Sequence, residues 1–215
     1  MRAREFIHIA EGSAEYDEPK NPSLELLKLK NQCKEILKTI ETVADTEEQE
    51  IISKIRIGID QSPERGASAV RSNMTVIVGF PMFEDAPEEV LTWAIAHEIA
   101  HIVKSHSYVD PDKKSKTPAD IRKIEIEADD WAHEIAKRLG VTKAAVWTWL
   151  HRKRGGIEKR LQWDASPAGQ EWNRNSTHPS VIDRIKNAQQ HGIELSKNDL
   201  ENMLDQLDQL ELTLA

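Results

Sequence analysis

Apolar residues recur at helical spacing along several segments, and these segments account for most of the elements that the chain is expected to form. Residues 23–44 carry leucine, isoleucine and valine on one face, directly after a proline that favours a helix start. Residues 87–106 open with Pro87 and two glutamates, both favourable in a first helical turn. Residues 118–139 form another helical pattern, which ends at Gly140. Further helices are predicted over 142–154, 180–191 and 196–214.

Two shorter segments have the pattern of strands. Isoleucine alternates with polar residues toward the end of residues 51–60, and residues 72–79 are rich in β-branched side chains. Charge, prolines and a lack of aliphatic residues predict loops over 45–50, 107–120 and 162–180. The whole pattern predicts an α+β fold that is predominantly helical, with a small sheet beside the 87–106 helix.

The domain organisation follows from the same pattern. We expect an extended N-terminal segment over residues 1–22, one main domain over 23–195, and a C-terminal helix over 196–215 that packs on this domain. That last helix has leucines near heptad spacing, but it spans too few heptads to predict a coiled coil. The sequence leaves the oligomeric state unknown.

Composition narrows the class of protein. The 215 residues include 37 acidic and 29 basic ones, a net charge of −8, which makes nucleic acid an unlikely general partner. The single cysteine, Cys33, excludes an intrachain disulfide and a cysteine-based metal site, and fits a reducing compartment. No run approaches the roughly 18 apolar residues of a membrane helix, and the first residues do not resemble a signal peptide. We therefore expect a soluble, cytoplasmic protein without membrane insertion.

The strongest chemical signal is the HExxH pattern His97-Glu98-Ile-Ala-His101, in the middle of the 87–106 helix. Histidines four residues apart lie about 40° apart around a helix, so both rings can bind one Zn²⁺. Glu98 is on the flank of that face, where it can act as general base on a water. The surrounding residues are apolar, and polar groups in such surroundings need a reason to be there. The pattern predicts zinc-dependent peptide hydrolysis.

A catalytic zinc usually has three protein ligands and a water, so a third ligand is needed. His106 lies one residue short of a known spacing, in which a histidine stands ten residues after His97. On the 118–139 helix, Glu125 projects at the edge of the apolar stripe, whereas Glu127 projects away from it. We predict that Glu125 is the third ligand. Asp129, one turn further, is predicted to accept the free N–H of a ligating histidine and so to orient it.

At this point the chain resembles the HtpX-like zinc endopeptidases, a family that includes the CAAX prenyl proteases. The family pattern is HExxH, then E-x-x-A-D on a second helix, then a His-Pro pair and a downstream arginine. Corresponding residues are found here at 97–101, 125–129 and 178–184. The resemblance covers roughly residues 50–190. It implies a soluble gluzincin, with a zincin-like metallopeptidase domain over residues 23–195.

The resemblance also implies roles for single residues. It makes Zn²⁺ the cofactor, Glu98 the base, Asp129 the orienting residue and the metal ligands His97, His101 and Glu125. It places His178 and Arg184 near the active site as catalytic residues that steady the oxyanion.

The substrate is expected to be a protein or peptide. Its backbone would add as a strand to an exposed edge at residues 73–78, beside Asn73, Thr75 and Ile77. Most relatives are embedded in membranes or exported, and this chain has neither feature, so membrane-protein substrates are not expected.

Other interpretations remain open. Residues 139–155 have the rhythm of the second half of a helix-turn-helix, so a DNA-binding regulator is the alternative, as is a protease that cleaves a regulator. A catalytically silent binding module is disfavoured, because base, ligands and orienting residue are all present. The 107–120 loop is either a lid or a simple connection. Surface positions are expected for His8, His133, His151 and His191.

Overall fold

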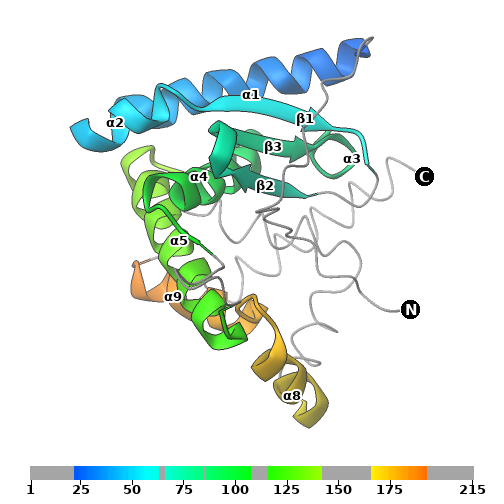
Figure 1. Cartoon of the computed structure of the whole chain (residues 1–215), viewed down its shortest axis with the longest axis vertical. Coiled ribbons are helices and arrows are strands. Elements are labelled where there is room, and N and C mark those ends of the chain that lie inside the picture. Colours follow the sequence, from blue (N-terminus) through cyan, green and yellow to red (C-terminus); the bar gives the residue numbers. More distant parts are fainter. Residues whose placement is uncertain (1–21, 63–65, 85, 108–115, 142–165, 193–215) are drawn as a thin grey trace. The chain divides into compact units, whose positions relative to one another are not determined.

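The structure is a computed structural model that describes residues 22–62, 66–84, 86–107, 116–141 and 166–192. The chain divides into two compact units, Met1–Tyr108 and Val109–Ala215. The described elements are mostly helices, with one small three-stranded sheet (Figure 1). The predominantly helical α+β class is therefore confirmed.

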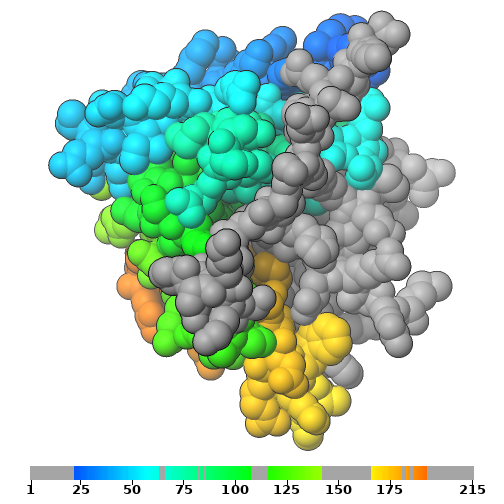
Figure 2. Space-filling model, in the orientation of Figure 1, coloured from blue at the N-terminus to red at the C-terminus, as the bar shows by residue number. Residues whose placement is uncertain are grey.

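The described part of the first unit begins with helix α1 (Leu24–Val43), close to the helix expected over residues 23–44. The Ser23 side chain caps it by accepting a hydrogen bond from the Leu26 backbone N–H at 3.2 Å. Its buried stripe packs against helix α4 and strand β1, and the opposite face is exposed (Figure 2). Cys33 lies in this stripe, where burial raises the pKa of its thiol to about 12. A thiol held neutral in this way is a packing group and not a metal ligand.

The sheet has the order β1-β3-β2. Strand β1 (Arg56–Asp60) pairs in parallel with β3 (Thr75–Gly79), and β2 (Ala67–Val70) pairs antiparallel with the other side of β3. The turn between β2 and β3 contains the 3₁₀ turn η1 (Arg71–Asn73) and Met74, which has a left-handed φ of 53°. All residues of β3 are buried, as expected for a strand with neighbours on both sides.

Helix α4 (Glu88–Val103) carries the HExxH pattern and packs against α1, β2 and β3. Every residue from Val90 to Ile102 is buried. A helix with apolar residues on all sides is stable only when it is covered, which agrees with this burial. The short helix α3 (Phe80–Phe83) lies between β3 and α4.

The second unit contains α5 (Pro118–Arg138), α8 (Pro167–Asn175) and α9 (Val181–Gln190), and both of the shorter helices contact α5. Gly140 has a φ of 73°, and Val141 N–H donates to the Ala136 carbonyl at 2.9 Å. This is a Schellman ending, so the glycine that predicted the end of this helix acts for the expected reason.

Two expectations about local structure were wrong. Residues 45–50 were expected to be a connection, but helix α2 (Thr46–Ile52) occupies them and shortens the strand expected over 51–60. The Glu48 carboxylate accepts from the Asp45 N–H at 3.3 Å, which is the capping-box contact of an Asp-x-x-Glu start. Within 162–180, expected to be a loop, Ser166 caps α8 at the Gly169 N–H. In both places the capping signal was present in the sequence and outweighed the polar composition.

Several expectations concern residues outside the described ranges. These are the helix over 142–154, the helix-turn-helix-like segment 139–155 beyond Val141, most of the 107–120 loop, and the terminal segments 1–21 and 196–215. Within the described residues, no helix is long and apolar enough to cross a membrane.

Candidate metal centre

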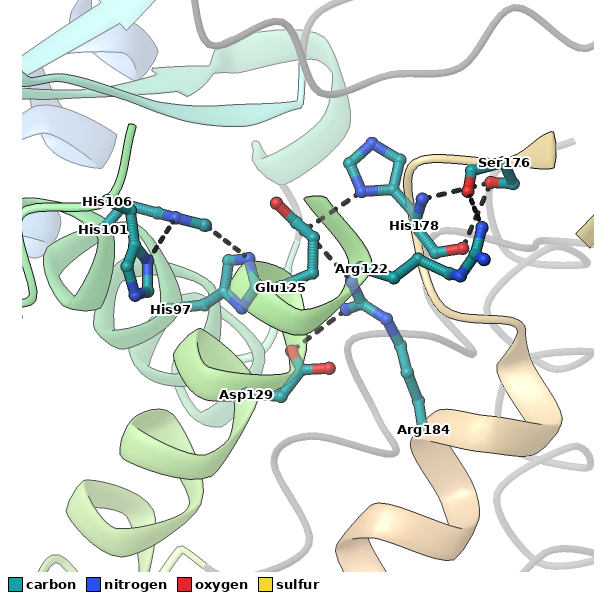
Figure 3. A network of polar contacts seen from close by, with 9 residues as sticks. All are labelled: His97, His101, His106, Arg122, Glu125, Asp129, Ser176, His178 and Arg184. Carbon is teal, nitrogen blue, oxygen red and sulfur yellow. Dashed lines mark hydrogen bonds and ion pairs between the residues drawn. The ribbon is translucent and has the colours of Figure 1, made fainter. Parts of the chain in front are cut away.

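The two histidines of the HExxH pattern turn their rings toward each other. His97 and His101 lie one turn apart on α4, and their side chains are 3% and 0% exposed. Their Nε2 atoms are 3.2 Å apart, and the ring planes make an angle of 78°. Figure 3 shows this pair beside His106. Two buried ring nitrogens on α4 therefore converge on one point.

This separation fits a shared metal ion. Two ligands at about 2.0–2.1 Å from a tetrahedral zinc lie about 3.3 Å from each other. The Nε2–Nε2 distance of 3.2 Å is close to that value without any rearrangement. The donor atoms are imidazole nitrogens, which zinc accepts readily. His97 and His101 thus fit the zinc ion that the HExxH pattern predicts.

The residues around the two histidines hold their rings in place. Trp93 stacks on His97 at a centroid distance of 5.4 Å, with an angle of 27° between the rings. Glu98 follows His97 directly and its side chain is fully buried. A carboxylate in such a place is costly unless it is paired or reacts with something that enters the site. Its position on α4 is the one predicted for a general base.

His106, rejected as a ligand from its spacing, contacts a predicted ligand. Its Nδ1 lies 3.0 Å from Nδ1 of His101, the nitrogen opposite the converging Nε2. Helix α4 ends in a Schellman motif, in which His106 N–H donates to the His101 carbonyl at 3.0 Å and Ser105 has a φ of 54°. That motif brings the residue two positions beyond the cap onto the last turn. Arg71 donates to the His106 carbonyl at 2.7 Å and anchors it to the sheet.

The role of His106 could have been found from the sequence only with difficulty. The usual marker of this helix ending is glycine in the left-handed position, and here that position is Ser105. Without a glycine, the sequence gives no sign that the chain folds back over His101 at this point.

In the second unit, Glu125 and Asp129 are 0% and 1% exposed, while Glu127 on the same helix is exposed. The helical projection had predicted this difference, because the first two lie at the border of the apolar stripe of α5. The ligand role of Glu125 itself stays a prediction.

His178 and Arg184 converge on the buried carboxylates of α5 (Figure 3). His178 Nδ1 lies 3.0 Å and Arg184 Nη2 lies 3.5 Å from the same atom, Oε2 of Glu125. Arg184 Nη1 also lies 3.2 Å from Oδ1 of Asp129. The side chains of His178 and Arg184 are 18% and 8% exposed. The oxyanion role expected for both residues stays a prediction.

The place expected for the substrate strand needs correction. Asn73 lies in η1, and Thr75 and Ile77 lie in β3, which pairs with β1 on one side and β2 on the other. A strand bonded on both sides has no open edge to which another chain can pair. The hydrophobic pattern gave the strand correctly, but only the pairing shows that it is central.

His133 and His191 were both expected at the surface, and for His133 this was wrong. His133 is 2% exposed, and its ring lies 5.1 Å from the His191 ring. His191 contacts Asp130 at 2.9 Å and Glu134 at 3.4 Å. These residues join α9 to α5, and the histidine that lies beneath them becomes part of the core.

Comparison with known proteins gives one match that covers most of the chain. The family model of peptidase U49 matches residues 13–204. No curated protein and no solved structure matches this chain. The match supports a peptidase, and it leaves the resemblance to the HtpX-like endopeptidases as a prediction. With a family model that spans both units, the chain belongs to the peptidase U49 family.

Proposed function

We propose that this peptidase is a zinc-dependent endopeptidase, with His97, His101 and Glu125 as metal ligands and Glu98 as general base. The observation that carries the proposal is the buried histidine pair, whose Nε2 atoms lie 3.2 Å apart on a helix that also bears a buried glutamate. Two histidines and one glutamate are a ligand set that catalytic zinc sites use, with one position left for water. Because the chain belongs to a peptidase family, the reaction expected at this site is hydrolysis of a peptide bond.

When bound, zinc supplies a Lewis acid and a water of lowered pKa. The residues of the chain do the rest. The Glu98 carboxylate takes a proton from the attacking water as its oxygen bonds to the scissile carbonyl carbon. Glu98 then gives that proton to the amide nitrogen as the C–N bond breaks, so the products are a carboxylic acid and an amine, which become a carboxylate and an ammonium group once the acid proton moves to the amine. Burial of Glu98 keeps bulk water away from this proton transfer.

The substrate backbone would pair with an edge strand, since protease substrates are commonly bound in extended form. With β3 in the centre, β2 (Ala67–Val70) is one of the two edge strands of the described sheet, and it packs against α4. We propose β2 as the substrate strand in place of residues 73–78.

The test separates metal binding from catalysis. Purified wild type, Glu98→Gln and Glu89→Gln are assayed for bound zinc and for cleavage of a proteome-derived peptide library. Glu89 is exposed in the first turn of the same helix, so its variant controls for the loss of one carboxylate on α4. We expect all three proteins to bind zinc, and cleavage to be lost only with Glu98→Gln.

Two outcomes would overturn the proposal. Cleavage by Glu98→Gln at the wild-type rate would show that Glu98 is not the general base. If wild type still cleaves after a chelator has stripped the zinc and no metal is detected in the protein, the reaction does not need a metal.

A further inference from the structure

The contacts of the second unit suggest how the proposed ligand Glu125 is kept in place. Its carboxylate and that of Asp129 lie one turn apart on α5, and both are buried. Like charges at this spacing repel, and burial strengthens the repulsion because little water screens it. A structure that keeps both carboxylates inside needs a cation between them.

Arg184 is that cation. Its guanidinium reaches Glu125 Oε2 with Nη2 at 3.5 Å and Asp129 Oδ1 with Nη1 at 3.2 Å, so the two arms of the fork contact different carboxylates. The Arg184 side chain is 8% exposed, so its positive charge acts mainly on neighbouring protein groups and little on solvent. A planar fork can bridge two acceptors in this way, whereas the ammonium of lysine would act as a single point charge.

His178 approaches the same oxygen from another segment. Its Nδ1 is 3.0 Å from Glu125 Oε2, so both neighbours occupy one oxygen of this carboxylate. Contacts from two directions on a single oxygen fix the rotation of the carboxylate about its own axis. The other oxygen, Oε1, is then presented in one defined direction.

The segment that carries His178 is held by α5 itself. Arg122, one turn before Glu125, donates to the carbonyls of Asn173 and Arg174 at 3.1 Å each and also to that of Ser176. The hydroxyl of Ser176 in turn contacts the backbone N–H and carbonyl of His178, each at 3.1 Å. The cation also caps the C-terminus of α8, where carbonyl groups are left over. Helix α5 therefore bears both Glu125 and Arg122, and Arg122 anchors the segment that carries His178.

We propose that Arg184 and His178 are positioning residues that hold Glu125 through Oε2 so that Oε1 binds the metal, with Arg122 fixing the segment that carries His178. This inference rests on the proposed function. It gives Arg184 and His178 a role that acts through Glu125 and differs from stabilisation of a substrate oxyanion. Groups that orient a metal ligand are typically worth about 10- to 100-fold in metal affinity.

The test measures metal binding, not turnover. Zinc affinity of the full chain is determined by competition with a chromogenic chelator for wild type, Arg184→Met, Arg184→Lys and His178→Gln. We expect Arg184→Met and His178→Gln to bind zinc about 10- to 100-fold more weakly, and Arg184→Lys to recover part of the loss. The control His191→Gln removes a contact between α9 and α5 that does not involve Glu125, and it should keep the wild-type affinity.

A second readout follows the geometry of the site. Replacing zinc with Co²⁺ gives visible absorption bands that depend on the ligands, and these bands should change in Arg184→Met but not in His191→Gln. If Arg184→Met does not fold, the double variant Arg184→Met/Asp129→Asn removes the excess buried charge and is compared with Asp129→Asn alone, and the double variant should bind zinc more weakly than that single variant.

The outcomes distinguish the two proposals. A wild-type chain that binds no zinc would overturn the proposed function and this inference with it. A wild-type chain that binds zinc, together with folded Arg184→Met and His178→Gln variants of unchanged affinity and Co²⁺ spectrum, would overturn the positioning role alone.

Discussion

Stability of the second unit should fall in acid because of one buried histidine. Burial is the main reason that the pKa of His133 is lowered from 6.5 to about 4. Among the smaller causes, Asp129 and Asp130 raise this pKa, and His191 and Arg184 lower it. The folded protein therefore resists protonation of a group that takes up a proton readily once the chain unfolds.

The sign and size of the effect follow from this difference. Because the folded pKa is depressed, the stability contributed by neutral His133 is present above pH 6.5 and is lost as the pH falls toward 4. At pH 5 the unfolded histidine is mostly protonated and the folded one is mostly neutral, which lowers the free energy of unfolding by about 2 kcal/mol. The loss levels off at about 3 kcal/mol below pH 4, since each pKa unit corresponds to about 1.4 kcal/mol.

The assay compares wild type with His133→Leu, which has a similar volume and does not titrate. Urea unfolding of metal-free protein at pH 7, 6 and 5 gives the free energy of unfolding, and omitting metal prevents zinc release from contributing. Between pH 7 and pH 5 the variant should lose about 2 kcal/mol less than wild type. Lys137→Gln on the exposed face of α5 is the control and should follow wild type. Equal losses in wild type and His133→Leu would refute the reasoning.

Further predictions concern the end of the HExxH helix and the end of α5. His106→Leu removes the ring that contacts His101 Nδ1 and should weaken zinc binding by about 10- to 100-fold in a chelator competition, and an unchanged affinity would deny it an orienting role. Ser105→Gly should stabilise the protein by about 0.5–1 kcal/mol, because glycine adopts the left-handed φ of 54° without strain. Gly140→Ala should destabilise it by about 1 kcal/mol through its φ of 73° alone, since no described atom lies within 4 Å of the added Cβ. Urea unfolding checks both, and a stabilised Gly140→Ala or a destabilised Ser105→Gly would contradict them.

The sequence by itself determined the long helices, because their apolar residues recur with a period that only a helix can bury on one side. It also indicated that Glu125 lies at the border of the apolar stripe of α5, because this depends only on the angle of the side chain around the helix axis. Short elements were less well predicted. The small side chains of β2 give no alternating pattern, and this strand exists because it pairs with β3.

Tertiary structure alone decided the surroundings of the candidate ligands. That β3 is central depends on pairing between segments far apart in the chain, and no local pattern records it. His133 is buried because α9 covers it, although a lone histidine on a helix suggests a surface position. Arg184 reaches Glu125 across more than fifty residues of chain. Local periodicity fixes the direction in which each side chain leaves its own helix or strand, whereas its partners depend on which other elements pack there.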